Sequence, residues 1–329
     1  MKVLVTGAAG FIGQHMVSRI RREGCEVRAF VLPGSGATWS ADPGVQTIEG
    51  DIRDYAAVSS AAKGVELIYH MAALTKPDSQ NWNALREINV GGTKNIAQAV
   101  LEQGVNRLVH VSSVAVYGRR NSHHGINEKT STRPDSPYAK TKLEAEQLLM
   151  SCYERNRLPV VITRTSNVFG PGVLDWRELF QVIAQGRFRF VGKGEGLMQV
   201  TSTDDLAEGL WLCGIRPAIE GNVYILTGDQ SITLREWIEL IRAETGGSIQ
   251  VPAIPGSLLR FYNMLNSLVY AVTGRELPKA DRINLFMGDR SFDISRAKED
   301  LGYQPGTSAA EIVHQTVKWF QSRGYLGQD

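Results

Sequence analysis

Short apolar runs alternate with amphipathic stretches along the first half of the chain. The run Val3–Val5 predicts a buried strand, and Ile12, Met16, Val17 and Ile20 follow at spacings of three and four residues, which predicts a helix. Five more short runs predict strands, with helical patterns between them. These strands are expected at Glu26–Val31, Val45–Ile48, Val65–His70, Arg107–Ser113 and Pro159–Arg164, and two later helices at Gly91–Gln103 and Pro137–Arg155.

This alternation predicts an α/β fold with a parallel, doubly wound sheet, in which ligands bind beyond the carboxyl ends of the strands. After Asn167 the pattern changes to a loop, a helix at Trp176–Gln185 and a returning strand at Asn222–Leu226. Thr233 is a candidate N-cap of another helix, and Glu236 three residues later completes a capping box. The second half of the chain is therefore expected to leave the sheet and return to it.

The composition narrows the class of protein. The 329 residues carry a formal net charge of +2, which gives no ground for a nucleic-acid partner. Cys25, Cys152 and Cys213 are scattered, without metal-ligand spacing or a disulfide framework, so a reducing cytoplasm is expected. A strand that starts at residue 3 leaves no room for a signal peptide, and no apolar run reaches the roughly 18 residues of a transmembrane segment. We therefore expect a cytoplasmic protein with a small-molecule substrate.

Three glycines lie between the first strand and the first helix. Gly7, Gly10 and Gly13 permit a tight turn, a close approach of the backbone to a pyrophosphate, and close packing of the helix on the strand. The free N–H groups and the dipole at a helix N-terminus favour an anion there. An ordinary turn is the alternative, but a nucleotide site is the better interpretation.

The end of the second strand bears on the choice of cofactor. An acidic residue there would accept a hydrogen bond from a ribose 2′-hydroxyl, and a basic residue would suit a 2′-phosphate. The chain has Val31 and Leu32, so the sequence does not choose between NAD and NADP. Arg28 lies nearby and is interpreted as a surface charge. Asp51, after the third strand, is a candidate contact of adenine, or else a cap of the next helix.

The fifth strand and a later helix carry residues suited to acid–base chemistry. Tyr138 and Lys142 are four residues apart and so share one helical face, and Ser113 ends the fifth strand. A free phenol has a pKa of about 10, and a nearby ammonium lowers it. Tyr138 could then exchange a proton with a substrate hydroxyl or carbonyl whose oxygen Ser113 holds. Taken alone, the Tyr-x-x-x-Lys spacing occurs by chance in many helices.

The combination of motifs is far more specific than any one of them. In order they are Thr6-Gly-x-x-Gly-x-x-Gly13, Gly50-Asp51, His70-Met-Ala-Ala73, Asn89-Val-x-Gly-Thr93, Ser113, Tyr138-x-x-x-Lys142 and Arg164-x-x-Asn167-x-x-Gly-Pro171. Over nearly the whole chain, this series resembles the extended short-chain dehydrogenase/reductase superfamily. That superfamily includes nucleotide-sugar epimerases and dehydratases and 3β-hydroxysteroid-dehydrogenase-like enzymes.

The resemblance implies a role for each position. Ser113, Tyr138 and Lys142 match catalytic residues, with Tyr138 as the general acid/base and Lys142 also binding the nicotinamide ribose. Asn89 matches a residue that helps to position the lysine through a water-mediated network; a helix cap is the alternative. Residues that match the cofactor site are Gly7, Gly10, Phe11, Ile12 and Gly13 at the pyrophosphate, Asp51 and Ile52 at the adenine, and Ala72 and Ala73 along the cofactor's path, where tight packing is the alternative. No metal site is expected.

The resemblance also implies the architecture, a doubly wound parallel (Rossmann) sheet with a smaller, mixed C-terminal substrate-binding domain. We expect residues 1–165, with returning segments near 203–230, to bind the dinucleotide, and residues 166–202 and 231–329 to bind the substrate. By analogy with family members, the helices at Gly91–Gln103 and Pro137–Arg155 are candidates for the contact of a homodimer.

The substrate side departs from the nucleotide-sugar pattern. Met198 stands where those family members usually carry an arginine that grips a diphosphate, a task suited to the planar guanidinium. Arg282 is close in register to a second such arginine. The segment 257–272 is unusually apolar, and core packing, a lid or membrane-facing surface, and a dimer contact are its three interpretations. Its stripe consists of Leu258, Tyr262, Leu265 and Val269, widened by Phe261, Leu268 and Val272.

These observations favour hydride transfer between a nicotinamide cofactor and a secondary alcohol or ketone, of the hydroxysteroid-dehydrogenase type. The alternative is a nucleotide-sugar epimerase or dehydratase, in which the hydride returns to the same substrate. A non-catalytic dinucleotide sensor is disfavoured because the serine, tyrosine and lysine are all present. The adjacent His123 and His124 are not expected to bind a metal. Thr75 and Lys76 either face the substrate or the nicotinamide or are solvated loop residues.

Overall fold

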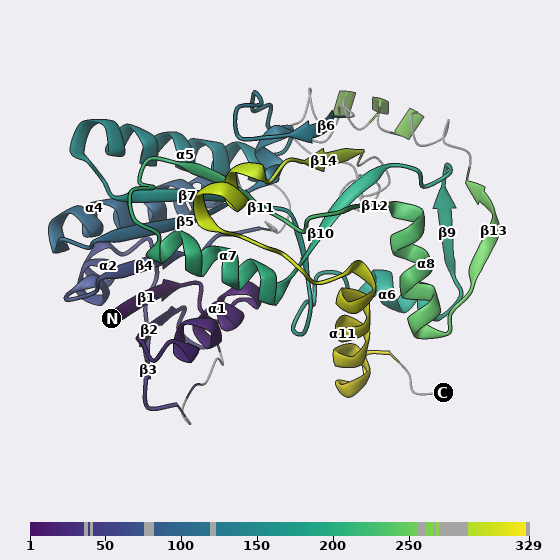
Figure 1. Ribbon diagram of the computed structural model, residues 1–329, viewed down its shortest axis with the longest axis horizontal. Coiled ribbons are helices and arrows are strands. Elements are labelled where there is room, and N and C mark those ends of the chain that lie inside the picture. The colour runs from purple at the N-terminus through teal and green to yellow at the C-terminus, as the bar shows by residue number, and fades with distance from the viewer. Residues whose placement is uncertain are drawn as a thin grey trace.

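Seven parallel strands form the central sheet (Figure 1). The computed structural model describes residues 1–35, 39, 42–75, 82–118, 123–254, 261–262, 264–265, 268–269 and 289–326. The sheet order is β11-β7-β5-β4-β1-β2-β3, and every neighbouring pair is parallel. The strands are β1 (Lys2–Thr6), β2 (Glu26–Val31), β3 (Val45–Glu49), β4 (Leu67–His70), β5 (Arg107–Ser113), β7 (Val160–Thr165) and β11 (Val223–Leu226). The chain direction across the sheet reverses between β1 and β4, which is where doubly wound sheets bind their ligands.

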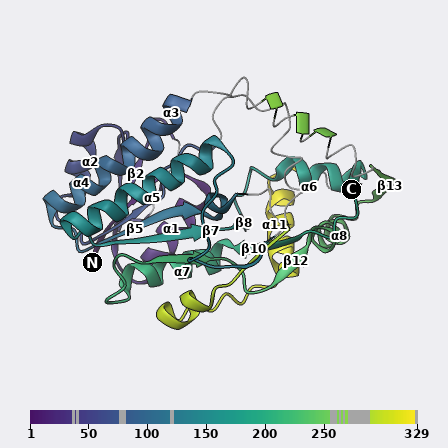
Figure 2. The ribbon, with the colours of Figure 1, turned by 90° about the horizontal axis from the view of Figure 1, so that it is seen from above.

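Helices cover both faces of this sheet (Figures 1 and 2). Successive strand residues point to opposite faces, so Val3 and Val5 belong to one apolar cluster and Leu4 to the other. The first cluster is completed by α1 (Phe11–Arg22) and α7 (Thr203–Ile215), which pack against each other. The second is completed by α2 (Tyr55–Ala62), α4 (Thr93–Gln103) and α5 (Pro137–Asn156).

The C-terminal part of the chain forms a smaller mixed structure beside the carboxyl end of the sheet (Figure 1). A third apolar cluster holds it together, with Phe169, Trp237 and Phe320 fully buried. Its helices are α6 (Arg177–Ala184), α8 (Leu234–Thr245) and α11 (Ala309–Ser322), and its strand sets are β12-β10-β8 (Ser231–Thr233, Leu197–Ser202, Asn167–Phe169), β13-β9 (Ile249–Ile254, Phe188–Val191) and β14-β6 (Arg290–Phe292, His123–Ile126). Within the described ranges, no helix has both the length and the apolar character needed to cross a bilayer.

The predicted fold class and most predicted elements are confirmed. Thr233 caps α8 and forms the predicted capping box with Glu236. Several boundaries differ by one or two residues, and one of these differences has a clear structural reason. The helix expected from Gly91 starts at Thr93, because Glu87–Gly92 form a wider π-helical turn ahead of it. A single extra residue in a turn leaves the apolar spacing almost unchanged, so the pattern alone does not reveal it.

One alternative from the sequence proves wrong. Asp51 does not cap α2, because the carboxylate of Asp54 accepts the hydrogen bonds from the backbone at the start of that helix. In the segment 257–272, the side chains of Phe261, Leu265 and Leu268 are exposed, while those of Tyr262 and Val269 are half-buried. Leu258 and Val272 of the same stripe lie outside the described residues, as do Lys76 and Arg282.

Candidate active site

The turn between β1 and α1 needs glycine at two of its three positions. Gly7 has a φ of +71°, and a Cβ there would lie 2.7 Å from the backbone nitrogen of Ala72. A Cβ on Gly13 would lie 2.1 Å from the carbonyl oxygen of Gly7. The turn therefore brings β1, α1 and the segment after β4 closer than side chains would allow. Gly10 is the N-cap of α1 and offers no side-chain cap, which leaves the N–H groups of Phe11 and Ile12 available for an anion.

The residues beside this turn fit a dinucleotide, but they do not decide its 2′ group. Leu32 at the end of β2 is exposed. The carboxylate of Asp51 accepts hydrogen bonds from the guanidinium of Arg53, which lowers the pKa of Asp51. Ile52 is buried against Gly92, where a Cβ would lie 2.4 Å from its side chain. Arg28 lies in mid-strand and donates to the carbonyl oxygens of Ala61 and Lys63 at the end of α2, so it is engaged away from the end of β2.

Ser113, Tyr138 and Lys142 come together at the carboxyl end of β5. The side chain of Ser136 caps α5 by accepting from the N–H of Ala139, and this places Tyr138 in the first turn. A hydrogen bond joins Ser113 and Tyr138. Nζ of Lys142 donates to the carbonyl oxygen of Val111 on β5 at 2.6 Å, which fixes the lysine on the sheet side of the helix.

The electrostatics of this group differ from the expectation. Burial raises the pKa of Tyr138 to about 12, and the hydrogen bond with Ser113 lowers it only in part. Burial also lowers the pKa of Lys142 to about 8. The expected net lowering of the phenol pKa is therefore not found in this structure, because removal from water outweighs the effect of the hydrogen bond. Tyr138 carries its proton at neutral pH.

Asn89 is buried in the π-helical turn and connects three segments around the site. Its Nδ2 donates to the carbonyl oxygen of Leu74 at 3.1 Å and to Oγ1 of Thr141 at 3.0 Å. Its Oδ1 accepts from the N–H of Leu74 at 2.8 Å. The helix-cap alternative is wrong, since none of these bonds caps a helix. The side chain ties the loop after β4 to the residue next to Lys142.

The sequence reasoning assigned no role to His70 and His110, which are buried side by side with ring centroids 5.2 Å apart. His70 bonds through Nδ1 to the hydroxyl of Thr6 at 2.8 Å and through Nε2 to the hydroxyl of Thr93 at 3.0 Å. Burial lowers the pKa of His70 to about 3, so the imidazole is neutral and joins β1, β4 and α4. The motif His70-Met-Ala-Ala73 was the signal in the sequence that could have pointed to His70.

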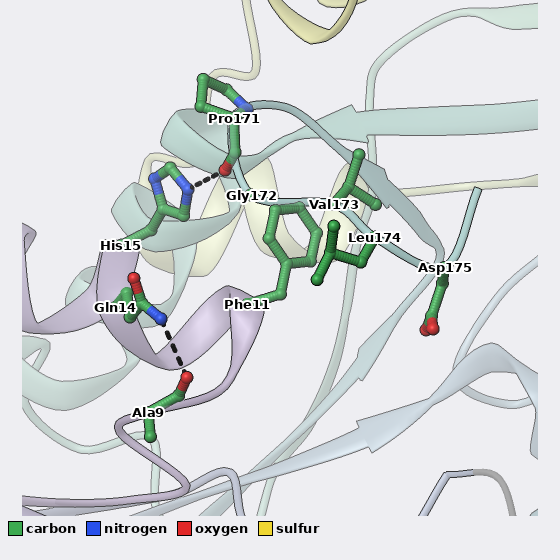
Figure 3. A pocket seen from close by; sticks show the side chains of 9 residues that line it. All are labelled: Ala9, Phe11, Gln14, His15, Pro171, Gly172, Val173, Leu174 and Asp175. Carbon is green, nitrogen blue, oxygen red and sulfur yellow. Dashed lines mark hydrogen bonds between the residues drawn. The ribbon is translucent and has the colours of Figure 1, made fainter. Parts of the chain in front are cut away.

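A cavity of about 320 Å³ flanks the glycine turn (Figure 3). It lies between the start of α1 and the loop that leads from β8 toward α6. Nε2 of His15 bonds to the carbonyl oxygen of Pro171 at 2.7 Å, which ties the two walls together. The lining residues are Ala9, Phe11, Gln14, His15, Pro171, Gly172, Val173, Leu174 and Asp175. The cavity thus joins the turn to the segment where the chain leaves the sheet.

Residues 3–224 match the NAD dependent epimerase/dehydratase family. The chain belongs to this family. This match confirms two predictions, the membership in the extended short-chain dehydrogenase/reductase superfamily and the nicotinamide dinucleotide cofactor. It does not choose between NAD and NADP. The tight glycine turn, with an uncapped helix N-terminus beside it, fits such a cofactor.

The chain is similar both to sterol-related proteins and to a nucleotide-sugar dehydratase. The 3β-hydroxysteroid-dehydrogenase/decarboxylase isoform 2 of Arabidopsis thaliana is 30% identical over 96% of this chain, which spans 61% of that longer protein. The sterol demethylase protein B of Methylococcus capsulatus is 29% identical over 99% of this chain and 100% of its own length. The structure of DesIV, a dTDP-glucose 4,6-dehydratase from Streptomyces venezuelae with NAD and TYD bound, is 27% identical, covers 99% of both chains and has a TM-score of 0.77.

Proposed function

We propose that the protein is an NAD(P)-dependent oxidoreductase that interconverts a secondary alcohol and a ketone, in the manner of hydroxysteroid dehydrogenases. The observation that carries this proposal is the grouping of Ser113, Tyr138 and Lys142 at the carboxyl end of β5, with Ser113 and Tyr138 hydrogen-bonded. These residue types at this place can hold a substrate oxygen and exchange its proton.

Each residue of the site has a proposed task, and Lys142 has two. The nicotinamide ring would supply the hydride acceptor or donor. Tyr138 exchanges the proton of the substrate oxygen, and Ser113 holds the same oxygen by a hydrogen bond. Lys142 binds the nicotinamide ribose and favours the phenolate when the phenol gives up its proton. Asn89 keeps the helix of Lys142 and the loop after β4 in place.

The remaining cofactor contacts are proposals as well. Asp51 and Ile52 would face the adenine, Ala72 and Ala73 would lie along the cofactor, and Gly10, Phe11 and Ile12 would meet the pyrophosphate. We assign residues 1–165 and 203–230 to the cofactor and residues 166–202 and 231–329 to the substrate. The pairing of β11 with β7 and the packing of α7 on α1 support this division.

An apolar substrate is supported by the surroundings of Met198. This side chain is buried in the third apolar cluster, on a strand where it pairs with Ile232. The position at which nucleotide-sugar members carry an arginine is therefore part of a core here. The two sterol-related proteins named above are consistent with an apolar substrate. The likeness to DesIV keeps a nucleotide-sugar epimerase or dehydratase as the second candidate.

The test is a pair of measurements on wild type, Tyr138→Phe and Tyr153→Phe. Tyr153 is a matched control because it lies on the same helix, α5, with its ring packed against Gly221. We expect NAD(P)H binding in all three proteins, and reduction of apolar cyclic ketones in wild type and Tyr153→Phe only. Turnover by Tyr138→Phe near the wild-type rate would refute the acid–base role. Micromolar binding of UDP, dTDP or GDP would favour the second candidate instead.

A further inference from the structure

Four polar side chains are buried together next to the candidate active site. Ser112 precedes Ser113 on β5, Tyr117 lies in the short helical turn after it, Glu146 is on α5 and Arg164 is on β7. Each of the four is less than a tenth exposed. We call these residues the Glu146 cluster. Charges are buried in this way only when they are paired and hydrogen-bonded.

Glu146 is the centre of the cluster. Its Oε1 accepts from Oγ of Ser112 at 2.5 Å, and its Oε2 accepts from Nη2 of Arg164 at 2.7 Å. Nε of Arg164 donates to both carboxylate oxygens at 3.2 Å, and Nη1 donates to Oη of Tyr117 at 2.7 Å. Tyr117 in turn donates to the carbonyl oxygen of Asn127 at 2.9 Å. The carboxylate thus links α5 to β5 directly and to β7 through the guanidinium.

The cluster and the candidate active site share one face of α5. Tyr138, Lys142 and Glu146 follow each other at four-residue intervals, so they stand one above another along the helix. Lys142 and Glu146 contact consecutive residues of β5: Lys142 donates to the carbonyl oxygen of Val111, and Glu146 accepts from Ser112. Ser113 is the next residue of the strand. These two links therefore determine where Ser113 lies relative to Tyr138.

We infer that Glu146, held by Arg164, is a positioning residue of this site, which fixes α5 against the end of β5 and supplies the negative charge that faces Lys142. The inference rests on the proposed function, because it assigns Glu146 a task only through Ser113, Tyr138 and Lys142. If the ion pair served the fold alone, its variants would lose stability, while kcat/KM and its pH dependence would stay at the wild-type values in the folded protein. The two cases can therefore be separated.

The groups that face Lys142 make the direction of the effect clear. His70 on β4 and His110 on β5 are neutral, because burial lowers the pKa of both, and the phenol of Tyr138 on α5 is neutral as well. Glu146 raises the pKa of Lys142 against the burial that lowers it to about 8. Arg164 on β7 faces the other side of the same carboxylate. Neutralising Glu146 would remove an attraction and leave this second cation uncompensated, so the ammonium would be lost at a lower pH.

The experiment measures the affinity for NADH or NADPH and the kcat/KM for a ketone as functions of pH. We expect both to fall as pH rises through the pKa of Lys142, and Lys142→Met to remove this alkaline limb. Glu146→Gln should move the limb to lower pH by about one unit. Glu144→Gln is the matched control, because Glu144 lies on the same helix but pairs with Arg86 on the outer side, where both side chains are much more exposed.

Two further variants separate positioning from charge. Ser112→Ala removes only the hydroxyl that Glu146 binds, and Glu146→Asp keeps the charge but shortens the side chain. Both should keep the alkaline limb in place and lower kcat/KM by roughly tenfold. They also keep the inference testable if Glu146→Gln does not fold.

The inference is overturned if the limb of Glu146→Gln stays at the wild-type pH, if Glu144→Gln moves it equally, or if Ser112→Ala has wild-type kcat/KM. The proposed function can fail separately. If the wild-type protein reduces no ketone, the pH dependence of cofactor binding in Lys142→Met, Glu146→Gln and Glu144→Gln still decides whether Glu146 acts on Lys142.

Discussion

Replacing Gly13 by alanine tests the reasoning about the cofactor turn most directly. The new Cβ would lie 2.1 Å from the carbonyl oxygen of Gly7 and 2.8 Å from both Cα and the carbonyl oxygen of Ala8, where ordinary contact begins near 3.4 Å. All three atoms belong to the backbone, so no side chain can rotate out of the way. The turn or the start of α1 must therefore shift by a substantial fraction of an ångström or more.

The expected cost follows from two opposing effects. Overpacking of this kind costs about 1–3 kcal/mol, while alanine in place of glycine inside a helix favours folding by up to about 1 kcal/mol. We therefore expect Gly13→Ala to lower the free energy of unfolding by about 1–2 kcal/mol. Gly10→Ala should behave differently, because its Cβ would meet only the Gly7 carbonyl oxygen, at 3.1 Å. Its stability should stay within about 1 kcal/mol of wild type, while the added methyl group weakens pyrophosphate binding.

Urea unfolding and NAD(P)H fluorescence titration measure the two quantities. Gly306→Ala is the control, since a Cβ there would meet no atom within 4 Å. We expect Gly13→Ala to lose both stability and affinity, Gly10→Ala to lose affinity, and Gly306→Ala to lose neither. A Gly13→Ala protein with wild-type stability and affinity would refute the argument that close backbone contact holds the turn.

Two further predictions follow from the site and from α2. Burial raises the pKa of Tyr138 to about 12. In a pH titration without cofactor, the difference in tyrosinate absorbance between wild type and Tyr138→Phe should therefore stay flat up to about pH 10. A step near pH 7 would contradict the raised pKa of Tyr138. Asp54→Ala should lower the free energy of unfolding by about 1 kcal/mol, because it removes the N-cap of α2, and Asp51→Ala should cost less, because Asp51 pairs with Arg53 at the surface. Equal losses in urea unfolding would contradict the assignment of the cap.

A local feature, such as a helix cap, could be predicted from the sequence where residues close together in the chain form it. The capping box of Thr233 and Glu236 needs only a four-residue pattern, and it is present. The boundary at Thr93 does not follow from the local pattern, because in the π-helical turn before it Asn89 is buried and bonds to Leu74 and Thr141, residues far apart in the sequence. The alternative that Asp51 caps α2 is wrong because Asp51 and Asp54 fit the same rule, and only the backbone path separates them.

The sequence alone determined the strands of the central sheet, several of its helices, and which chemical groups the protein carries to the end of β5. Apolar spacing encodes strands and helices directly, and the motif series identified the superfamily. The tertiary structure decided the electrostatics and the partnerships. Whether Tyr138 is ionised depends on how far the fold removes it from water, and burial, not the spacing to Lys142, sets the direction of its pKa. The proposed task of Glu146 likewise depends on contacts that form where β5, α5 and β7 meet. The sequence does not reveal it, because hydrogen bonds between distant segments leave no periodic pattern in the chain.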